Sequence, residues 1–206
     1  MRVKTDQKRQ AILAAAGELF RELGYAGASM AAVSERVGGS KATLYRYFPS
    51  KEDLFVTILL ESALDRASHV FVTLSHAAGP GKSLERFGRI YLEQALTDEV
   101  IAVRRNLIAE GHRSGIGQKL YERGVQVMWA KMADFLAEEI RRGRLRDDDP
   151  WIMAMHLRGM LESDLISRAL IGAQVDRRPA ALRDHAARVA DVMMRAFAPE
   201  RVDDPA

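Results

Sequence analysis

The stretch GGSKATLYRYFPSKEDLF, residues 38–55, decides how this chain folds. It begins with a glycine pair and a serine that can cap a short helix over residues 41–48, and a proline follows that helix. After the proline, Ser50 and Asp53 have the spacing of a capping box, which predicts that a further helix begins at Lys51. The stretch therefore divides into a short helix and the start of another.

Two more helices are predicted upstream of this stretch. Residues 6–23 place apolar side chains at i, i+3 and i+4 spacing, and Gly24 follows where a left-handed residue can end a helix. Ser29 can cap a short helix that ends at Gly38. Two short helices joined by a glycine-containing turn and packed on a longer one form a helix-turn-helix, whose second short helix enters the major groove of DNA.

The helix over residues 41–48 has one face suited to DNA. With Leu44 and Phe48 turned inward, the opposite arc carries basic, hydroxyl-bearing and small side chains and no acid. Such groups can meet guanine, thymine methyl groups or phosphate. We expect these contacts from Lys41, Ala42, Thr43, Tyr45 and Arg46. In the alternative interpretation, the aromatic side chains belong to the core and the basic ones form an ordinary solvated face. That interpretation does not explain why basic, hydroxyl-bearing and small side chains share one arc of the helix.

The charge distribution agrees with this expectation. Residues 1–51 carry nine basic and four acidic side chains, a net charge of +5, whereas the other 155 residues sum to −2. A basic end on a nearly neutral body is typical of nucleic-acid binding. On charge alone, a solvated surface with a chance asymmetry stays an equal alternative.

The rest of the chain predicts an all-α protein. With 206 residues and 48% hydrophobic content, the chain can bury a full core. No strand-like alternation competes with helices over about 51–77, 82–97, 99–112, 117–142, 149–171 and 179–197. The absence of cysteine excludes disulfides and thiolate metal sites and suits a reducing, cytoplasmic location. No signal peptide or membrane span is visible.

The segment SMAAVSERVGGSKATLYRYFPSKEDLF, residues 29–55, resembles the DNA-binding signature of the TetR/AcrR family of bacterial transcriptional regulators, and the resemblance extends over about residues 8–60. It implies a homodimer with a helix-turn-helix DNA-binding domain, residues 1–50, and a ligand-binding and dimerisation domain, residues 51–206. By position it implies base or backbone contacts from Lys41, Ala42, Thr43 and Tyr45, phosphate contacts from Tyr47 and Lys51, and a supporting contact from Ser29. Gly39 departs from the family, which often has a branched apolar residue there.

The C-terminal region supports dimerisation. Residues 141–173 are similar to the ligand-binding domains of AefR-like members of the family. The final helix has two apolar stripes, one formed by Leu182, Ala186, Val189, Met193 and Phe197 and the other by Ala187, Ala190 and Met194. One stripe can cover its own core and the other can meet a partner, so we expect a homodimer through the last two helices. In the alternative, the protein is a monomer and both apolar stripes are buried within its own core.

The middle helices offer an apolar pocket for a small molecule. The candidate ligand contacts are Leu96, Val103, Leu107, Met128, Trp129, Met132, His156 and Met160, and Arg104, Glu110 and His112 could add polar contacts. A stripe of methionine and aromatic residues also suits an ordinary core. No catalytic motif or phosphate loop is present, so we expect neither an enzyme nor a cofactor.

These observations predict a repressor that binds a palindromic DNA operator and is released by a largely apolar effector. One alternative is a transcriptional activator of the same fold. Another is a helical ligand-binding or interaction protein that does not act on DNA and whose basic end meets an acidic partner or a membrane.

Overall fold

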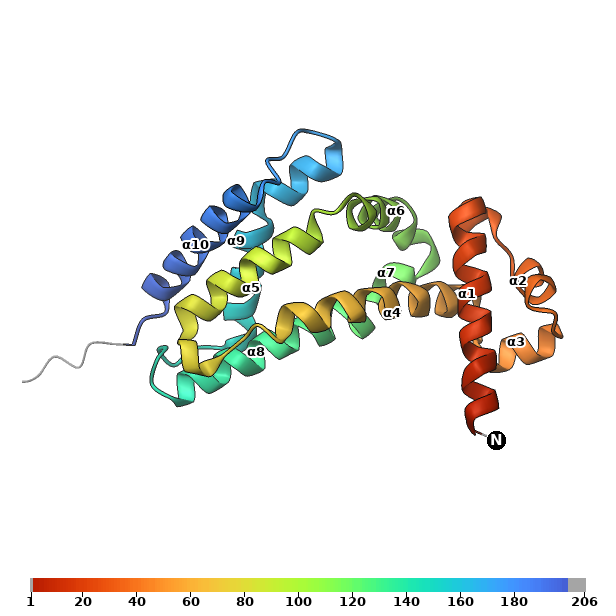
Figure 1. Ribbon diagram of the computed structural model, residues 1–206, viewed down its shortest axis with the longest axis horizontal. Helices are drawn as coiled ribbons and strands as arrows, with labels where there is room; N and C mark the ends of the chain where they lie inside the picture. Colours follow the sequence, from red (N-terminus) through yellow and green to blue (C-terminus); the bar gives the residue numbers. More distant parts are fainter. Residues whose placement is uncertain (1, 200–206) are drawn as a thin grey trace, which may run out of the picture. The chain divides into compact units, whose positions relative to one another are not determined.

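A computed structural model describes residues 2–199, with the side chains of this range except those of 2–5, 62–69, 110 and 112–114. Every regular element in that range is a helix, and it contains no strand (Figure 1). The all-α fold predicted from the sequence is therefore confirmed. Within residues 2–199, no helix combines the length and apolar composition that a membrane crossing requires.

The chain forms two compact units. Residues up to 64 and the segment 110–124 make the first unit, and residues 65–109 and those from 125 onward make the second. The first four helices are α1 (Arg2–Gly27), α2 (Met30–Val37), α3 (Lys41–Tyr47) and α4 (Lys51–Phe71). They are followed by the 3₁₀ turn η1 (His76–Ala78), α5 (Pro80–Ala95), α6 (Asp98–Ser114), α7 (Ile116–Leu120), the π-helical turn η2 (Tyr121–Val125), α8 (Gln126–Arg141), α9 (Pro150–Ile171) and α10 (Pro179–Ala196).

The predicted helix boundaries near the N-terminus match the structure closely. Ser29 caps α2, because its Oγ accepts a hydrogen bond from the backbone N–H of Ala32 at 3.1 Å. Gly38 ends α2 in the left-handed conformation, at φ 66°. Gly24 is non-helical inside α1, at φ 71°, so the regular part of α1 ends where the sequence predicted. These caps satisfy backbone groups that a free helix end would leave unpaired.

The first unit has its own apolar core. Helices α1, α2 and α3 and the start of α4 surround it (Figure 1), and its fully or nearly fully buried members are Ile12, Leu13, Ala16, Leu19, Phe20, Ala28, Met30, Val33, Leu44, Phe48 and Leu54. Because Leu44 and Phe48 belong to this core, the inner face of α3 is fixed and its outer face is turned to solvent.

In the second unit, α10 packs against α5 and α9, and α8 packs against α9. The predicted stripe of α10 is buried throughout, from Leu182 to Phe197. The second stripe is largely covered within the same chain. Ala190 is buried, and a Cβ placed on Gly81 of α5 would lie 3.2 Å from Met194 Cγ. This stripe is therefore not the free face that the sequence suggested.

Two predicted helices are interrupted. The helix expected over 117–142 is three elements, α7, η2 and α8, since the hydrogen-bond register widens to a π turn over Tyr121–Val125. The helix expected over 51–77 ends at Phe71, and η1 follows separately. Helix α9 has the predicted extent but is kinked by a non-helical residue, Ser163.

Candidate nucleic-acid interface

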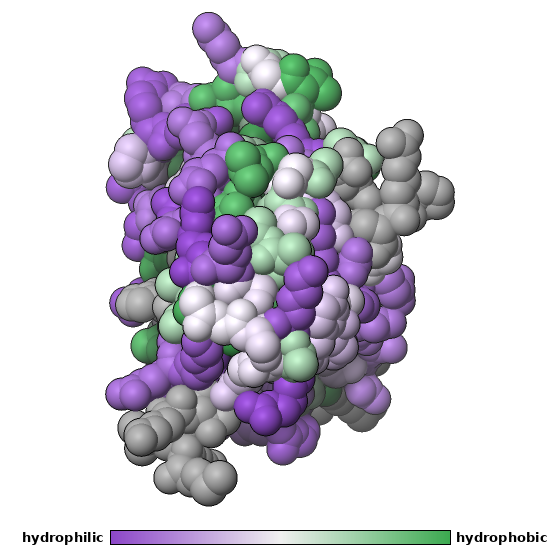
Figure 2. Space-filling view, turned by 90° about the vertical axis from the view of Figure 1, so that its right-hand side faces the viewer, coloured by the Kyte–Doolittle hydropathy of each residue, from purple (hydrophilic) through white to green (hydrophobic). Residues whose placement is uncertain are grey.

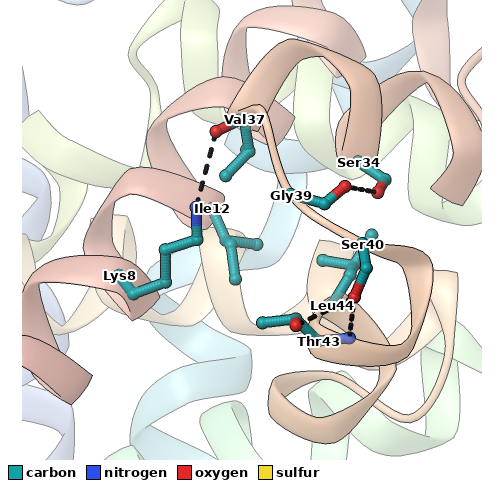
Figure 3. Close-up of a pocket in the computed structure, with 8 residues that line it drawn as sticks. All are labelled: Lys8, Ile12, Ser34, Val37, Gly39, Ser40, Thr43 and Leu44. Atoms are coloured by element: carbon teal, nitrogen blue, oxygen red, sulfur yellow. Dashed lines mark hydrogen bonds between the residues drawn. The ribbon is translucent and has the colours of Figure 1, made fainter.

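The turn between α2 and α3 is held by hydroxyl groups. Ser40 Oγ accepts from the Thr43 backbone N–H at 3.1 Å, which caps α3, and Ser34 Oγ donates to the Gly39 carbonyl oxygen at 2.7 Å (Figure 3). Lys8 Nζ, from α1, donates to the Val37 carbonyl oxygen at 3.4 Å. These bonds fix the angle at which α3 leaves α2, so the turn keeps its shape without a side chain at position 39.

The outer face of α3 is open to solvent. Lys41, Ala42 and Arg46 are exposed, and Tyr45 is 48% exposed. Thr43 is half-buried, and its hydroxyl lies 3.0 Å from Ser40 Oγ. This arrangement agrees with the helical wheel of the sequence, while contact with DNA stays a prediction for each of these residues. Figure 2 shows hydrophilic side chains on the face over α1–α3 interspersed with side chains of intermediate hydropathy and with apolar ones.

Aromatic rings contact one cation of α3 and one cation at the start of α4. The Arg46 guanidinium lies 5.7 Å from the centroid of the Tyr47 ring. Lys51 Nζ lies 4.3 Å from the centroid of the Tyr25 ring and donates to the Ala26 carbonyl oxygen at 3.5 Å. Cation–π contacts of this kind restrict a flexible side chain while leaving its charge available. Lys51 is therefore held at the N-terminus of α4, where backbone N–H groups also favour anions.

The pocket behind the turn is too small for an effector. It is lined by Lys8, Ile12, Ser34, Val37, Gly39, Ser40, Thr43 and Leu44 and has a volume of about 10 Å³ (Figure 3). That volume is the space of about one water molecule. The absence of a Cβ at position 39 contributes to this gap, because such an atom would lie 3.5 Å from Lys8 Nζ.

The start of α4 is tied to the segment that follows α6. Ser50 Oγ accepts from the Asp53 backbone N–H at 3.0 Å, which confirms Ser50 as the cap of α4. The Asp53 carboxylate accepts from the Ser50 hydroxyl at 2.8 Å, whereas a capping box would have it accept from the Ser50 backbone N–H. The Asp53 carboxylate also pairs with Lys119 Nζ at 3.1 Å and Arg123 Nη1 at 3.0 Å. We call Asp53, Lys119 and Arg123 the α4 clamp. No local sequence pattern predicts this clamp, since Lys119 and Arg123 lie 66 and 70 residues after Asp53.

Two carboxyl groups at the start of α4 have lowered pKa values. Burial alone would raise the pKa of Asp53, but hydrogen bonds from Ser50, Lys119 and Arg123 outweigh it and lower that pKa. The pKa of Glu52 is lowered chiefly by its own backbone N–H, with a further contribution from the Tyr25 hydroxyl, which donates to Glu52 Oε1 at 2.8 Å. Both carboxylates are therefore charged at neutral pH, and that charge suits a helix N-terminus.

The structure divides the predicted ligand-binding residues among different places. Leu96, Trp129 and Met132 are buried in the core of the second unit, and Val103, Leu107 and Met128 are half-buried. His156 and Met160 instead line an open groove of about 560 Å³ between α9 and α10, with Arg146, Asp148, Met155, Gly159, Val192, Ala196 and Phe197. The predicted residues therefore do not line one common pocket among the described residues, and ligand contact stays a prediction for each of them. The side chains of Glu110 and His112 lie outside the described residues.

Comparison with known proteins places both units in one family. Residues 12–58 match the family described as bacterial regulatory proteins, tetR family. Residues 82–199, more than half of the chain, match the AefR-like transcriptional repressor C-terminal domain. Among curated proteins, the activator FasR of Mycolicibacterium smegmatis is 40% identical over 58 residues and the regulator RutR of Escherichia coli 42% identical over 52 residues. These matches cover 28% and 25% of this chain but only 26% and 24% of the relatives.

Solved structures resemble almost the whole chain. A TetR-family transcriptional regulator from Mesorhizobium loti has a TM-score of 0.77 and 27% identity over 94% of this chain and 98% of its own. The flavonoid-responsive regulator FrrA has a TM-score of 0.78 and 26% identity over 95% of this chain and 99% of its own.

Proposed function

This chain belongs to the TetR family of bacterial regulatory proteins and carries an AefR-like C-terminal domain, and from that premise we propose that it is a homodimeric, ligand-responsive transcriptional repressor. In this proposal, residues 1–50 bind a palindromic operator and residues 51–206 bind the effector and dimerise. The protein acts on cytoplasmic DNA and is not an enzyme. The single observation that carries the proposal is the exposed outer face of α3, anchored from behind by buried Leu44 and Phe48.

The polar groups around α3 support DNA contact. Lys41 and Arg46 supply exposed donors for guanine or phosphate, and Ala42, Thr43 and Tyr45 supply the surrounding small and hydroxyl-bearing surface. Tyr47 and Lys51 are the phosphate contacts in this proposal, and Ser29 supports the backbone at the start of α2. Lys51 suits that role because the Tyr25 ring already holds its ammonium group.

The α4 clamp supports a route for ligand control within the first unit. The clamp joins the N-terminus of α4 to α7 and η2. This end of α4 directly follows α3, the proposed DNA-recognition helix. A change in the backbone of η2 would move Arg123 and thereby the start of α4. For near-complete release from DNA, the effector must favour the released state by about 5.5 kcal/mol.

Exposed apolar groups support a homodimer through α9 and α10. Ile152 on α9 is 44% exposed and Val192 on α10 is 43% exposed, although both are large aliphatic side chains. Gly159 on α9 is exposed, and a Cβ placed there would meet nothing within 4 Å. An open, apolar, sparsely covered helix pair is the kind of surface that a second copy covers in an isologous dimer. The two α3 recognition helices of the dimer then contact DNA half-sites whose separation is about 34 Å or a multiple of that distance.

Activation is the one specific alternative to repression. FasR is an activator by name, whereas AcnR of Corynebacterium diphtheriae, 38% identical over 63 residues, is a repressor. The AefR-like match over residues 82–199 favours repression for this chain. The flavonoid-responsive neighbour favours an effector that is small and largely apolar.

Mapping of genomic binding sites, followed by titration of the recovered site, tests this function. We expect one palindromic sequence, bound with an affinity that falls steeply as salt rises and bound poorly when scrambled. Transcription from the adjacent promoter rises on deletion of a repressor and falls on deletion of an activator. Equal affinity for the recovered palindrome and for scrambled DNA contradicts the proposal. That result favours a helical interaction protein with a basic end.

A further inference from the structure

A group of charged and aromatic side chains in the second unit lies apart from the DNA-binding face. Glu162 Oε1 on α9 accepts from the Tyr91 hydroxyl, pairs with Arg104 Nη2 at 3.0 Å and pairs with Arg158 Nε at 3.4 Å. Arg104 Nη2 also lies 3.4 Å from the Tyr91 hydroxyl. Glu162 Oε1 therefore contacts donor groups from three helices, α5, α6 and α9. We call Tyr91, Arg104, Arg158 and Glu162 the polar cluster.

The polar cluster carries an excess positive charge at a partly buried place. Two guanidinium groups face one carboxylate, while the Tyr91 hydroxyl is neutral because burial and the nearby Glu162 charge raise its pKa. Burial alone would raise the pKa of Glu162, but Arg104 outweighs it and keeps this group ionised. The side chains of Arg104, Arg158 and Glu162 are 25%, 27% and 17% exposed, so solvent or a ligand reaches them. A partly buried charge without its counterpart is costly.

A second observation concerns the indole of Trp129, which contacts the cluster. The Trp129 side chain is completely buried, and its Nε1 has no hydrogen-bond partner among the described residues. The Trp129 ring contacts the ring of Tyr91 at 5.4 Å between centroids, and the Arg158 guanidinium lies 5.9 Å from its centroid. Buried indole N–H groups usually have a partner. Among the described side chains, an indole whose N–H has no partner therefore contacts a cluster that holds two guanidinium groups and one carboxylate.

From this juxtaposition we propose that the polar cluster binds the carboxylate of an effector that has an apolar body. Arg104 and Arg158 are the anchoring donors, since guanidinium groups match carboxylate geometry. On α6, half-buried Val103 and Leu107 flank Arg104 in sequence and offer an apolar surface for the body of the ligand. Glu162 holds the two arginines in place and competes with the effector carboxylate for them. The inference rests on the proposed effector response and specifies its chemistry.

Calorimetric titration of the full-length protein, without DNA, tests the proposal with two acid–amide pairs. The probes are 2-naphthoate and decanoate, each compared with its neutral primary amide. We expect at least one acid to bind roughly tenfold or more tightly than its amide, the effect of a charge-assisted hydrogen bond. Amides that bind as tightly as the acids, or failure of both acids to bind, overturn the proposal.

Three variants locate the binding site. Arg158→Gln should weaken the acid about tenfold and leave the amide unchanged. Arg89→Gln is the matched control, because Arg89 also pairs with a glutamate four residues later, Glu93, and should change neither affinity. Glu162→Gln should tighten acid binding by removing the competing carboxylate. A merely structural role for Glu162 predicts the reverse, weaker binding of both probes, and that result rejects the proposal.

The same probes separate this inference from the proposed function. In one outcome, an acid binds more tightly than its amide and still fails to release the protein from its operator. That result supports the carboxylate site at the polar cluster and contradicts control of DNA binding by the effector. Operator binding that persists in a protein with no affinity for either acid supports the DNA-binding function and rejects the cluster assignment.

Discussion

At the scale of single residues, the two glycines of the α2–α3 turn differ. Gly38 has a φ of 66° and ends α2, so a side chain there is strained. Gly39 is not among the glycines with positive φ, and a Cβ on it would make ordinary contacts with Lys8, at 3.5 Å to Nζ and 3.7 Å to Cε. Position 39 therefore accepts a side chain, and position 38 does not.

Gly39→Ala should stabilise the protein by about 0.4–1 kcal/mol, because alanine restricts the unfolded chain and fits the gap behind the turn. Gly38→Ala is the matched control and should destabilise it by about 1 kcal/mol or more. Urea unfolding of both variants checks the pair. Loss of stability in Gly39→Ala contradicts this description of the turn and indicates that the glycine is required there.

At the scale of elements, local sequence predicted helix ends well. Ser29, Ser40 and Ser50 act as caps because each hydroxyl accepts from a free backbone N–H three residues later. The π turn over Tyr121–Val125 carries no comparable signal, and periodicity alone extends one helix across it.

Residues that act through distant partners were beyond local sequence reasoning. A helical wheel shows which side of a helix is buried but not which neighbour covers it. For that reason the sequence pattern does not separate His156 and Met160, which line the α9–α10 groove, from Trp129, which lies in the core. The α4 clamp and the polar cluster likewise depend on tertiary contacts. Of their members, the sequence alone indicates Arg104 as a candidate polar ligand contact and Asp53 as part of a helix cap.

Loss of the α4 clamp should loosen the start of α4 without unfolding the protein. In Lys119→Ala/Arg123→Ala, the partly buried Asp53 loses both cations, and we expect a cost of about 1 kcal/mol, equivalent to roughly fivefold faster amide exchange in the first turn. Hydrogen-exchange mass spectrometry of residues 51–56 measures this. Glu122→Gln, an exposed change in the same segment, should leave that exchange unchanged. Equal protection in the double variant and the parent shows that the clamp does not hold α4.

At the scale of the whole molecule, the proposed dimer depends on exposed apolar side chains of α9 and α10. Ile152→Arg/Val192→Arg should weaken self-association by about a hundredfold or more, because an uncompensated buried charge costs about 3–5 kcal/mol. Sedimentation velocity over a range of concentrations measures the change. Ile171→Arg is the control, since Ile171 is 82% exposed and lies at the opposite end of α9 from Ile152. A double variant that stays dimeric places the interface elsewhere.

The central claim is that the outer face of α3 binds operator DNA, and fluorescence anisotropy with the genomic palindrome tests it most directly. Arg46→Ala should stay folded and lose about 1–3 kcal/mol of binding free energy, because an exposed donor to base or phosphate is removed. Arg168→Ala removes the same charge from an exposed ion pair on α9 and should bind as the parent does. An Arg46→Ala protein that binds the operator as tightly as the parent contradicts the claim.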